Sequence, residues 1–147
     1  MTIIVDTNII ISASLNARSE LFQILTNTYT DLDFASPDFA LKEIVKHQTE
    51  ICQKLKRSLL FFQNNLSVLL NHLIILPDEY LSEINMQEAE TLTASIDIDD
   101  TIFVAFAVAL DSLLWTGDLK LYKALRRKGF TNVILTKELK LILKGLW

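Results

Sequence analysis

The segment Thr2–Asn8, with the sequence TIIVDTN, decides how the rest of the chain is interpreted. It begins with a short run of apolar and β-branched residues, which is typical of a buried strand. The polar residues Asp6, Thr7 and Asn8 then end that strand. In a parallel α/β sheet, ligands bind beyond the carboxyl ends of the strands. Asp6 therefore stands where a functional side chain is expected if the remaining segments build such a sheet.

Four further segments have the composition of short buried strands: Leu32–Ala35, Leu73–Leu76, Leu113–Trp115 and Val133–Leu135. Segments with helical spacing of apolar residues separate them: Ile9–Leu15, Ser19–Thr28, Ile51–Leu70 with a break near Asn64-Asn65, Glu79–Ser95, the apolar run Ile102–Leu110, Leu119–Lys128, and a last helix from Thr136. Strands that alternate with helices predict a parallel sheet with helices on both faces. We therefore expect an α/β protein with three α/β/α layers and a short central parallel sheet.

One further helix is predicted from its start signal. Ser36 and Pro37 suggest an N-cap followed by proline at the first helical position. Glu43 then lies two turns into this helix. At the other end of the chain, Gly129 is expected to close the basic helix Leu119–Lys128.

Length and composition favour one ordinary globular domain spanning residues 1–147. Half of the residues are hydrophobic, only 3 Gly and 2 Pro occur, and the formal net charge is −4. A single cysteine, Cys52, excludes an intramolecular disulfide and fits a reducing cytoplasm. We expect no signal peptide and no transmembrane helix, because the longest apolar run is far shorter than the ~20 residues that cross a bilayer. The expected location is cytoplasmic.

Four acidic residues from distant segments are expected to converge at one edge of the predicted sheet. Asp6 follows the first strand, and Asp118 follows Leu113–Trp115 after a two-residue turn. Asp100 opens the apolar helix, and Glu43 lies on the helix that begins near Pro37. Four carboxylates this close would repel one another unless cations neutralised them. The sequence therefore predicts a metal site made by Asp6, Glu43, Asp100 and Asp118.

Hard oxygen ligands favour Mg²⁺ or Mn²⁺, and such a site suits phosphodiester hydrolysis. A bound metal lowers the pKa of a coordinated water and stabilises charge on the phosphate and the leaving oxygen. In this interpretation water is the nucleophile, and no Ser, Cys or His nucleophile is required.

Each of the four acids also has a purely structural interpretation. Asp6 could be a strand-ending turn residue, and Glu43 a solvated helix residue. Asp100 could be an acid favoured by the dipole of the helix that it opens. Asp118 could cap the basic helix, a role that is compatible with metal binding.

Four other polar residues lie beside these acids. Asp97 could be the N-cap of the following helix, and Asp99 a first-turn acid. Asn8 could orient Asp6 or a water, and Thr116 could hydrogen-bond a carboxylate or a phosphate. Turn roles are the alternative for Asn8 and Thr116. We keep Asn8, Asp97 and Thr116 as secondary candidates.

At four places the sequence resembles the PIN-domain family. The segments are Ile3–Asn8, Leu41–Ile44 around Glu43, Asp97–Ala105 around Asp100, and Leu114–Asp118. Each motif alone is weak, but their order, spacing and strand–helix context together are specific. The resemblance spans nearly the whole chain, from Thr2 to about Leu135, and is least detailed between Ile51 and Glu90.

The resemblance implies a Mg²⁺- or Mn²⁺-dependent endoribonuclease that cuts an RNA substrate. It further implies a toxin of a toxin–antitoxin pair, an antitoxin protein as partner, and a homodimer. It assigns metal binding and catalysis to Asp6, Glu43, Asp100 and Asp118.

A basic helix begins beside Asp118 and suggests where RNA could bind. Its candidate phosphate-binding side chains are Lys120, Lys123, Arg126 and Arg127. A solvated helix face is the structural alternative for all of them.

Two other functions stay open from the sequence. The chain could be a catalytically silent PIN-fold module that binds nucleic acid or protein. More remotely, it could be an aspartate-based phosphatase or phosphotransfer domain in which Asp6 is phosphorylated. The second alternative requires a lysine near the end of a later strand, and the strand exits offer none in place.

Overall fold

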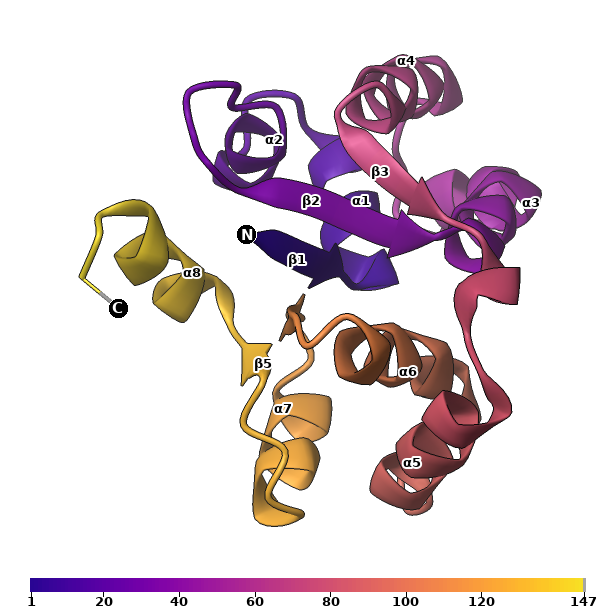
Figure 1. Ribbon diagram of the computed structural model, residues 1–147. Coiled ribbons are helices and arrows are strands. Elements are labelled where there is room, and N and C mark those ends of the chain that lie inside the picture. Colours follow the sequence, from indigo (N-terminus) through magenta and orange to yellow (C-terminus); the bar gives the residue numbers. More distant parts are fainter. Residues whose placement is uncertain (147) are drawn as a thin grey trace.

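The fold is a five-stranded parallel sheet between two layers of helices (Figure 1). The computed structural model describes residues 1–146, so Trp147, the last residue of the expected domain, lies outside the described part. The strands are β1 (Thr2–Val5), β2 (Asp33–Pro37), β3 (Leu73–Leu76), β4 (Leu113–Trp115) and β5 (Val133–Ile134). Their order in the sheet is β3-β2-β1-β4-β5, and every pairing is parallel. The α/β expectation with a short parallel sheet is confirmed.

The helices connect the strands in chain order. They are α1 (Thr7–Leu15), α2 (Glu20–Leu25), α3 (Asp38–Lys54), α4 (Leu59–Leu70), α5 (Glu83–Thr93), α6 (Thr101–Ala109), α7 (Leu119–Arg127) and α8 (Thr136–Leu143). Two short 3₁₀ segments, η1 (Asp78–Tyr80) and η2 (Ile98–Asp100), precede α5 and α6. In Figure 1, α1 to α4 lie on one side of the sheet and α5 to α7 on the other.

The centre of the sheet is β1, whose alternating side chains enter two different cores. Ile3 and Val5 pack with α1, α3 and α4 residues, whereas Ile4 packs with α6 and α7 residues. All three side chains are fully buried. Burying apolar surface on both faces is the main favourable contribution to folding, so a near-continuous apolar strand is required here. This central position also places the end of β1, and hence Asp6, between the ends of β2 and β4.

The predicted start of α3 was wrong by one or two residues. Ser36 and Pro37 belong to β2, Pro37 is the residue before the helix, and no side chain caps it. The hydroxyl of buried Ser36 instead donates a 3.1 Å hydrogen bond to the carbonyl oxygen of Val5. A tertiary contact between neighbouring strands has replaced the local capping role that the sequence suggested.

The predicted break near Asn64-Asn65 was also wrong. Helix α3 ends at Lys54 and α4 begins at Leu59. Lys56 adopts a left-handed backbone with φ 53°, and the hydroxyl oxygen of Ser58 accepts a 3.3 Å bond from Phe61 N. Asn65 lies inside α4, where its amide nitrogen donates a 2.9 Å bond to the carbonyl oxygen of Ser14.

Other boundaries moved by a few residues. The predicted helix Glu79–Ser95 is divided into η1 and α5, because Ser82 forms a capping box with Asn85. Leu135 precedes α8 rather than ending β5. Helix α2 ends at Leu25, three residues earlier than predicted. Within the described residues, none of the helices combines the length and the apolar character needed to span a membrane.

Candidate metal centre

Asp6 lies at the carboxyl end of β1 and caps the first turn of α1. It is 4% exposed. Its Oδ1 accepts a 2.7 Å hydrogen bond from Thr7 N, and its Oδ2 accepts a 2.6 Å bond from the hydroxyl of Thr116. Burial raises the pKa of Asp6 and nearby Asp118 raises it further, while the bonds from Thr116 and Thr7 lower it. The carboxylate is therefore held rigidly in one orientation and is costly to keep charged without a cation.

The turn after β4 brings Asp118 to the same edge of the sheet. Asp118 Oδ1 accepts bonds of 2.9 Å from Lys120 N and 3.1 Å from Leu121 N, so it caps α7. The backbone N–H of Asp118 donates a 3.0 Å bond to the Thr116 hydroxyl oxygen. Because that hydroxyl also donates to Asp6, one buried side chain fixes both strand ends.

Asp100 is the last residue of η2 and the residue before α6. Its side chain makes no capping bond to the helix. Burial raises the pKa of Asp100 to about 7, and four nearby acids (Asp6, Asp97, Asp118 and Asp99) add to the shift. A carboxylate in this surrounding binds either a proton or a cation near neutral pH.

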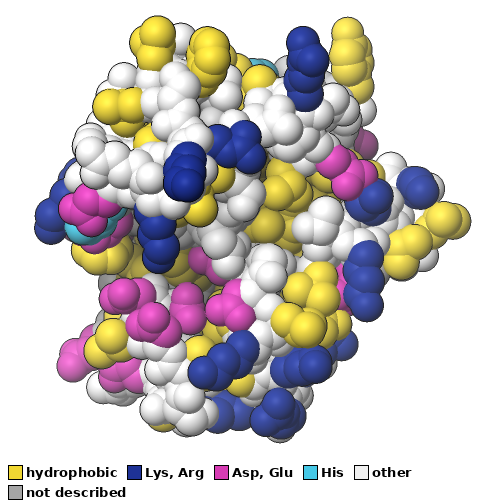
Figure 2. Space-filling view, turned by 180° about the vertical axis from the view of Figure 1, so that it is seen from behind, with side chains coloured by type: hydrophobic (Ala, Val, Ile, Leu, Met, Phe, Trp, Pro, Cys, Tyr) yellow, Lys and Arg dark blue, Asp and Glu magenta, His cyan; other side chains and the backbone are white. Residues whose placement is uncertain are grey.

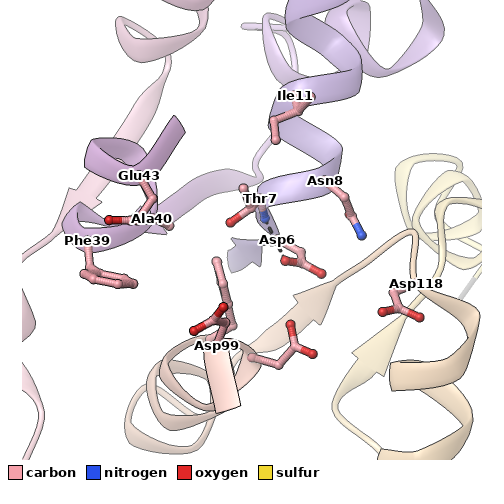
Figure 3. Close-up of a pocket in the computed structure, with 11 residues that line it drawn as sticks. Asp6, Thr7, Asn8, Ile11, Phe39, Ala40, Glu43, Asp99 and Asp118 are labelled. Carbon is pink, nitrogen blue, oxygen red and sulfur yellow. Dashed lines mark hydrogen bonds between the residues drawn. The ribbon is translucent and has the colours of Figure 1, made fainter. Parts of the chain in front are cut away.

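Glu43 lies on the face of α3 that borders the same pocket. His47, one turn further along the helix, contacts its Oε2 at 3.3 Å through Nε2, and Glu50 at 3.7 Å through Nδ1. Figure 3 shows Glu43 on the side of the pocket opposite Asp118. The orientation of the Glu43 carboxylate is therefore influenced by its contact with His47.

One pocket of about 310 Å³ collects the four predicted acids (Figure 3). Its lining is Asp6, Thr7, Asn8, Ile11, Phe39, Ala40, Glu43, Asp99, Asp100, Phe103 and Asp118. No lysine or arginine is in this lining, which comes from described residues. The concentration of negative charge without a basic partner is the main electrostatic property of the site.

The donor set fits a hard divalent cation. Carboxylate oxygens are the ligands that Mg²⁺ and Mn²⁺ prefer. Burial, with repulsion from neighbouring acids, raises the pKa of Asp6 and of Asp100, so a cation would stabilise their charged forms. In residues 1–146, as their side chains are oriented here, no three Asp, Glu, His or Cys side chains are close enough to hold one ion. Side chains of the pocket, including Glu43 beside His47, would therefore have to rotate toward one another to hold an ion together.

The secondary candidates occupy different positions. Thr116 is fully buried between Asp6 and Asp118 N. Asn8 lines the pocket, and its Oδ1 accepts a 3.3 Å bond from Gly117 N, so it clamps the turn after β4 rather than Asp6 itself. Asp97 lies outside the pocket lining and accepts a 3.0 Å bond from Asp99 N.

Asp99 lines the pocket, although we predicted for it only a helix first-turn position and no site role. Figure 3 shows its carboxylate directed into the space between α1 and α6. The 3₁₀ turn of η2 sends the adjacent residues Asp99 and Asp100 to the same cavity, whereas Asp97 caps the turn. The sequence signal for Asp99 is the acidic segment from Asp97 to Asp100. Spacing alone does not tell which of its aspartates faces the pocket.

Basic side chains gather near the acidic band (Figure 2). Figure 2 shows acidic side chains across the middle of one face, with lysine and arginine side chains below them. On α7, Lys120, Lys123 and Arg127 are exposed, and within residues 1–146 they form no ion pair. Their phosphate-binding role stays a prediction.

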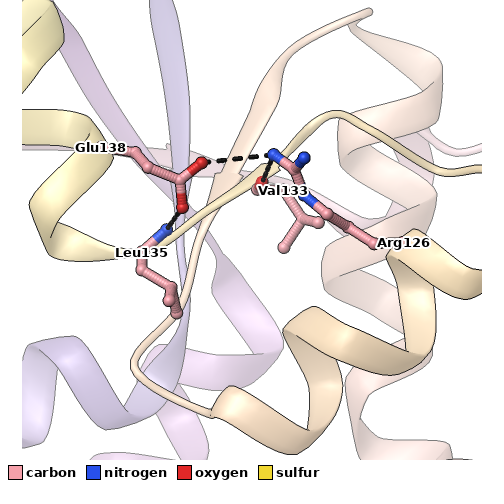
Figure 4. A network of polar contacts seen from close by, with 4 residues as sticks. All are labelled: Arg126, Val133, Leu135 and Glu138. Atoms are coloured by element: carbon pink, nitrogen blue, oxygen red, sulfur yellow. Dashed lines mark hydrogen bonds and ion pairs between the residues drawn. The ribbon is translucent and has the colours of Figure 1, made fainter.

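Arg126 has a different environment from these three residues (Figure 4). Its Nη2 lies 3.2 Å from Glu138 Oε2 and 3.4 Å from the carbonyl oxygen of Val133, and its guanidinium lies over the ring of Tyr122. The other oxygen of Glu138 accepts a 3.1 Å bond from Leu135 N. Arg126 therefore joins α7 to β5 and α8 through Nη2. Its charge is paired with Glu138, so it is a weaker candidate for holding a phosphate than the other three residues.

The fold resembles solved structures of VapBC complexes. One is the crystal structure of VapBC2 from Rickettsia felis bound to a DNA fragment from their promoter. The alignment covers 92% of this chain and 97% of the chain in that structure, with 20% sequence identity and a TM-score of 0.65. The fold also resembles VapBC-1 from nontypeable Haemophilus influenzae, with 18% identity, 86% and 94% coverage and a TM-score of 0.59. At these identities the similarity concerns the fold.

A search of curated proteins finds no match. A comparison with protein families matches the PIN domain over residues 4–136. The match begins in β1 and ends at the start of α8, so it contains every acid of the pocket. The resemblance noted from the sequence is confirmed: this chain belongs to the PIN-domain family, whose members are generally nucleases.

Proposed function

We propose that this chain is a metal-dependent endoribonuclease, with residues 1–147 acting as one nuclease domain. The observation that carries the proposal is the pocket that Asp6, Glu43, Asp100 and Asp118 line together, without a basic side chain in its lining. A bound Mg²⁺ or Mn²⁺ would supply a nucleophilic hydroxide at neutral pH and neutralise charge on the phosphate. Membership of the PIN-domain family supports this assignment.

Each acid has a separate task in the proposal. Asp6 is the rigid ligand, because two hydrogen bonds hold its carboxylate in place. Asp118 is tied to its helix through one oxygen, Oδ1, which leaves Oδ2 for the pocket. Asp100 gives up its proton close to neutral pH when positive charge arrives. Glu43 closes the set after leaving His47.

The basic residues of α7 are proposed to hold the RNA backbone. Lys120 and Lys123 lie on the helix that Asp118 caps, so their charges begin one turn from the acids. Phosphate contacts of this kind position a strand without reading its sequence. They also compensate for the repulsion between RNA and a chain whose net charge is −4.

We further propose that the chain is a toxin with an antitoxin partner and that it forms a homodimer. The similarity of fold to VapBC2 and VapBC-1 supports a protein partner. The exposed apolar side chains of α4, Leu60 and Phe61, offer surface that either association could cover.

The phosphotransfer alternative finds no support in the pocket. An aspartyl-phosphate needs a lysine beside the phosphoryl group, and no lysine of the described chain lines the pocket around Asp6. A silent binding module would not need the four acids, which are all present at the pocket.

The test is a cleavage assay with a mixed panel of labelled RNAs and single-stranded DNAs, with Mg²⁺, Mn²⁺ or EDTA. Wild-type protein is compared with Asp6→Asn, which keeps the size of the side chain. Metal-dependent RNA cleavage by the wild type alone supports the proposal. Equal cleavage by Asp6→Asn, or cleavage that persists in EDTA, contradicts it.

A further inference from the structure

A second pocket, of about 420 Å³, lies next to the acidic one. Its lining is Phe39, Asp78, Leu81, Met86, Glu90, Ile98, Asp99, Thr101 and Ile102. Phe39 and Asp99 line both pockets, so the two cavities adjoin along these side chains. A ligand that reaches the acids can therefore place a neighbouring group in the second pocket.

The chemistry of the second pocket is apolar with acidic groups at its border. Leu81, Met86 and Ile102 supply aliphatic and thioether surface, and Asp78 and Glu90 supply exposed carboxylates. No basic side chain is in this lining. Lys42, whose pKa Asp38 raises first and Asp78 also raises, forms a 2.8 Å ion pair with Asp38. Phosphate is repelled by such a surface, whereas a flat ring with N–H donors at its edge is complementary to it.

Phe39 supplies a ring between the two cavities. It lies in the first turn of α3 and is 44% exposed, although both pockets adjoin it. Figure 3 shows its ring on the same side of the acidic pocket as Glu43 and away from Asp118. Aromatic side chains that border a nucleic-acid groove stack on unpaired bases, with a typical loss of roughly 5- to 150-fold in affinity on removal.

The positions of these side chains would place the RNA backbone and one of its bases in different parts of the site. Figure 3 shows Asp118 and Phe39 on opposite sides of Asp6. Lys120 and Lys123 belong to the helix that Asp118 caps. A strand whose phosphates follow α7 and cross the acids would bring its next base to Phe39. The acids Asp78, Glu90 and Asp99 would then face the edge of that base.

We propose that this second pocket is a subsite for one unpaired base, guanine, beside the phosphate that is cut. Guanine fits because its Watson–Crick edge presents adjacent N1–H and N2–H donors, which a carboxylate accepts together. Phe39 stacks on the base, and Asp78 or Glu90 receives the donors. The subsite rests on the proposed ribonuclease function and adds its substrate class: RNA that is single-stranded at the cut.

The experiment measures RNA binding and cut-site choice in parallel. Fluorescence anisotropy in EDTA gives the affinity for short single-stranded RNAs that carry each of the four bases. Sequencing of products from a random RNA pool cut in Mg²⁺ gives the base beside the cut. The variants are Phe39→Ala, Phe39→Leu, and the double variant Asp78→Asn/Glu90→Gln.

Phe61→Ala is the matched control, because Phe61 is 68% exposed on α4 and lines neither pocket. We expect Phe39→Ala to bind guanine-containing RNA roughly 5- to 150-fold more weakly than the wild type. Phe39→Leu should recover little of this affinity, because leucine has no ring to stack on the base. The double variant should lose the preference for guanine while still cutting single strands. Thermal unfolding of each variant checks the fold.

Three results would overturn the subsite. Phe39→Ala could bind and cut as the wild type does, all four bases could be bound equally, or the double variant could keep the preference for guanine. Wild-type protein that binds guanine through Phe39 in EDTA and cuts nothing in Mg²⁺ supports the subsite and contradicts the proposed nuclease instead.

Discussion

The hydroxyl of Thr116 donates a 2.6 Å hydrogen bond to Oδ2 of Asp6, across 110 residues of sequence. The same oxygen accepts the backbone N–H of Asp118 at 3.0 Å. A single buried side chain thus sets the distance between the ends of β1 and β4. The metal site proposed here depends on that distance, which makes Thr116 a positioning residue.

Replacing Thr116 with valine tests this role. Thr116→Val keeps the shape but leaves Asp6 Oδ2 and Asp118 N without their partner, so we expect a loss of about 1–3 kcal/mol in unfolding free energy. Cleavage should fall roughly 10- to 100-fold. Urea unfolding and kcat measurements check both. Thr116→Ser, which restores the hydroxyl, should recover most of the activity, and failure of that recovery would contradict the role.

The pKa of Asp100 predicts how the metal-free protein responds to pH. Its folded pKa is raised from 3.8 to about 7, so the folded state favours the protonated form. The stabilising effect of that proton is complete below about pH 4 and is lost as pH rises through 7. The free energy of unfolding in EDTA should therefore fall between these values.

Asp100→Asn isolates this contribution. Since the group is only partly buried, solvent screening limits the effect, and we expect the variant to be about 1–2 kcal/mol more stable than wild type at pH 8. At pH 4 the two proteins should unfold alike. Denaturant unfolding at both pH values measures the two stabilities. A difference in unfolding free energy between the variant and the wild type that is the same at both pH values would contradict the raised pKa of Asp100.

Arg126 and Arg127 are neighbours with different expected roles. Arg126 pairs with Glu138, whose side chain is only 12% exposed, whereas Arg127 forms no ion pair with any other described residue. Arg126→Ala would leave Glu138 without its cation, and we expect a loss of about 1–3 kcal/mol in stability. Arg127→Ala should lose less than 0.5 kcal/mol or so. Equal melting temperatures for the two variants would contradict this distinction.

The exposed cations of α7 should control RNA affinity through salt. Lys120→Ala and Lys123→Ala each remove one charge near the acids, so the slope of log K against log salt should fall by roughly 0.7 per charge. Binding should weaken similarly for all sequences, because phosphate contacts carry no base information. Filter binding at several salt concentrations measures both. Lys144→Ala, at the C-terminal end of α8, is the control. An equal change in the salt dependence for Lys144→Ala would contradict a specific role of α7 in RNA binding.

The sequence predicted those parts of the fold in which local pattern and tertiary environment agree. Residues Ile3–Val5 are apolar throughout, and the structure buries both of their faces. As expected, Gly129 closes the basic helix just beyond its last turn, and its φ of 84° suits a residue without a side chain. In both segments the local preference and the packing favour the same conformation.

Errors arose where a tertiary contact overrode a local signal. Ser36 carries the signature of an N-cap, yet its hydroxyl bonds to Val5 across the sheet. The break before α4 uses a left-handed Lys56, a residue that gives no turn signal of its own. Such contacts join residues that sequence spacing does not relate.

The sequence predicted that the four acids converge at one edge of the sheet, and one pocket collects them, but it did not predict their geometry. In a parallel sheet all strands end at one edge, so Asp6 and Asp118 were expected there; the structure adds that β1 and β4 are neighbours. The direction of Asp99 and the contact between Glu43 and His47 depend on a 3₁₀ turn and on side-chain rotation. Neither can be derived from the order of residues.

The most direct measurement is a calorimetric titration of Mn²⁺ into wild-type protein and into Asp100→Asn at pH 7.5. If Asp6, Glu43, Asp100 and Asp118 form one metal site, the wild type binds Mn²⁺ with release of a proton, and Asp100→Asn loses most of that affinity. Equal Mn²⁺ binding by the two proteins, or no binding by the wild type, would contradict the central claim that these acids build a metal centre.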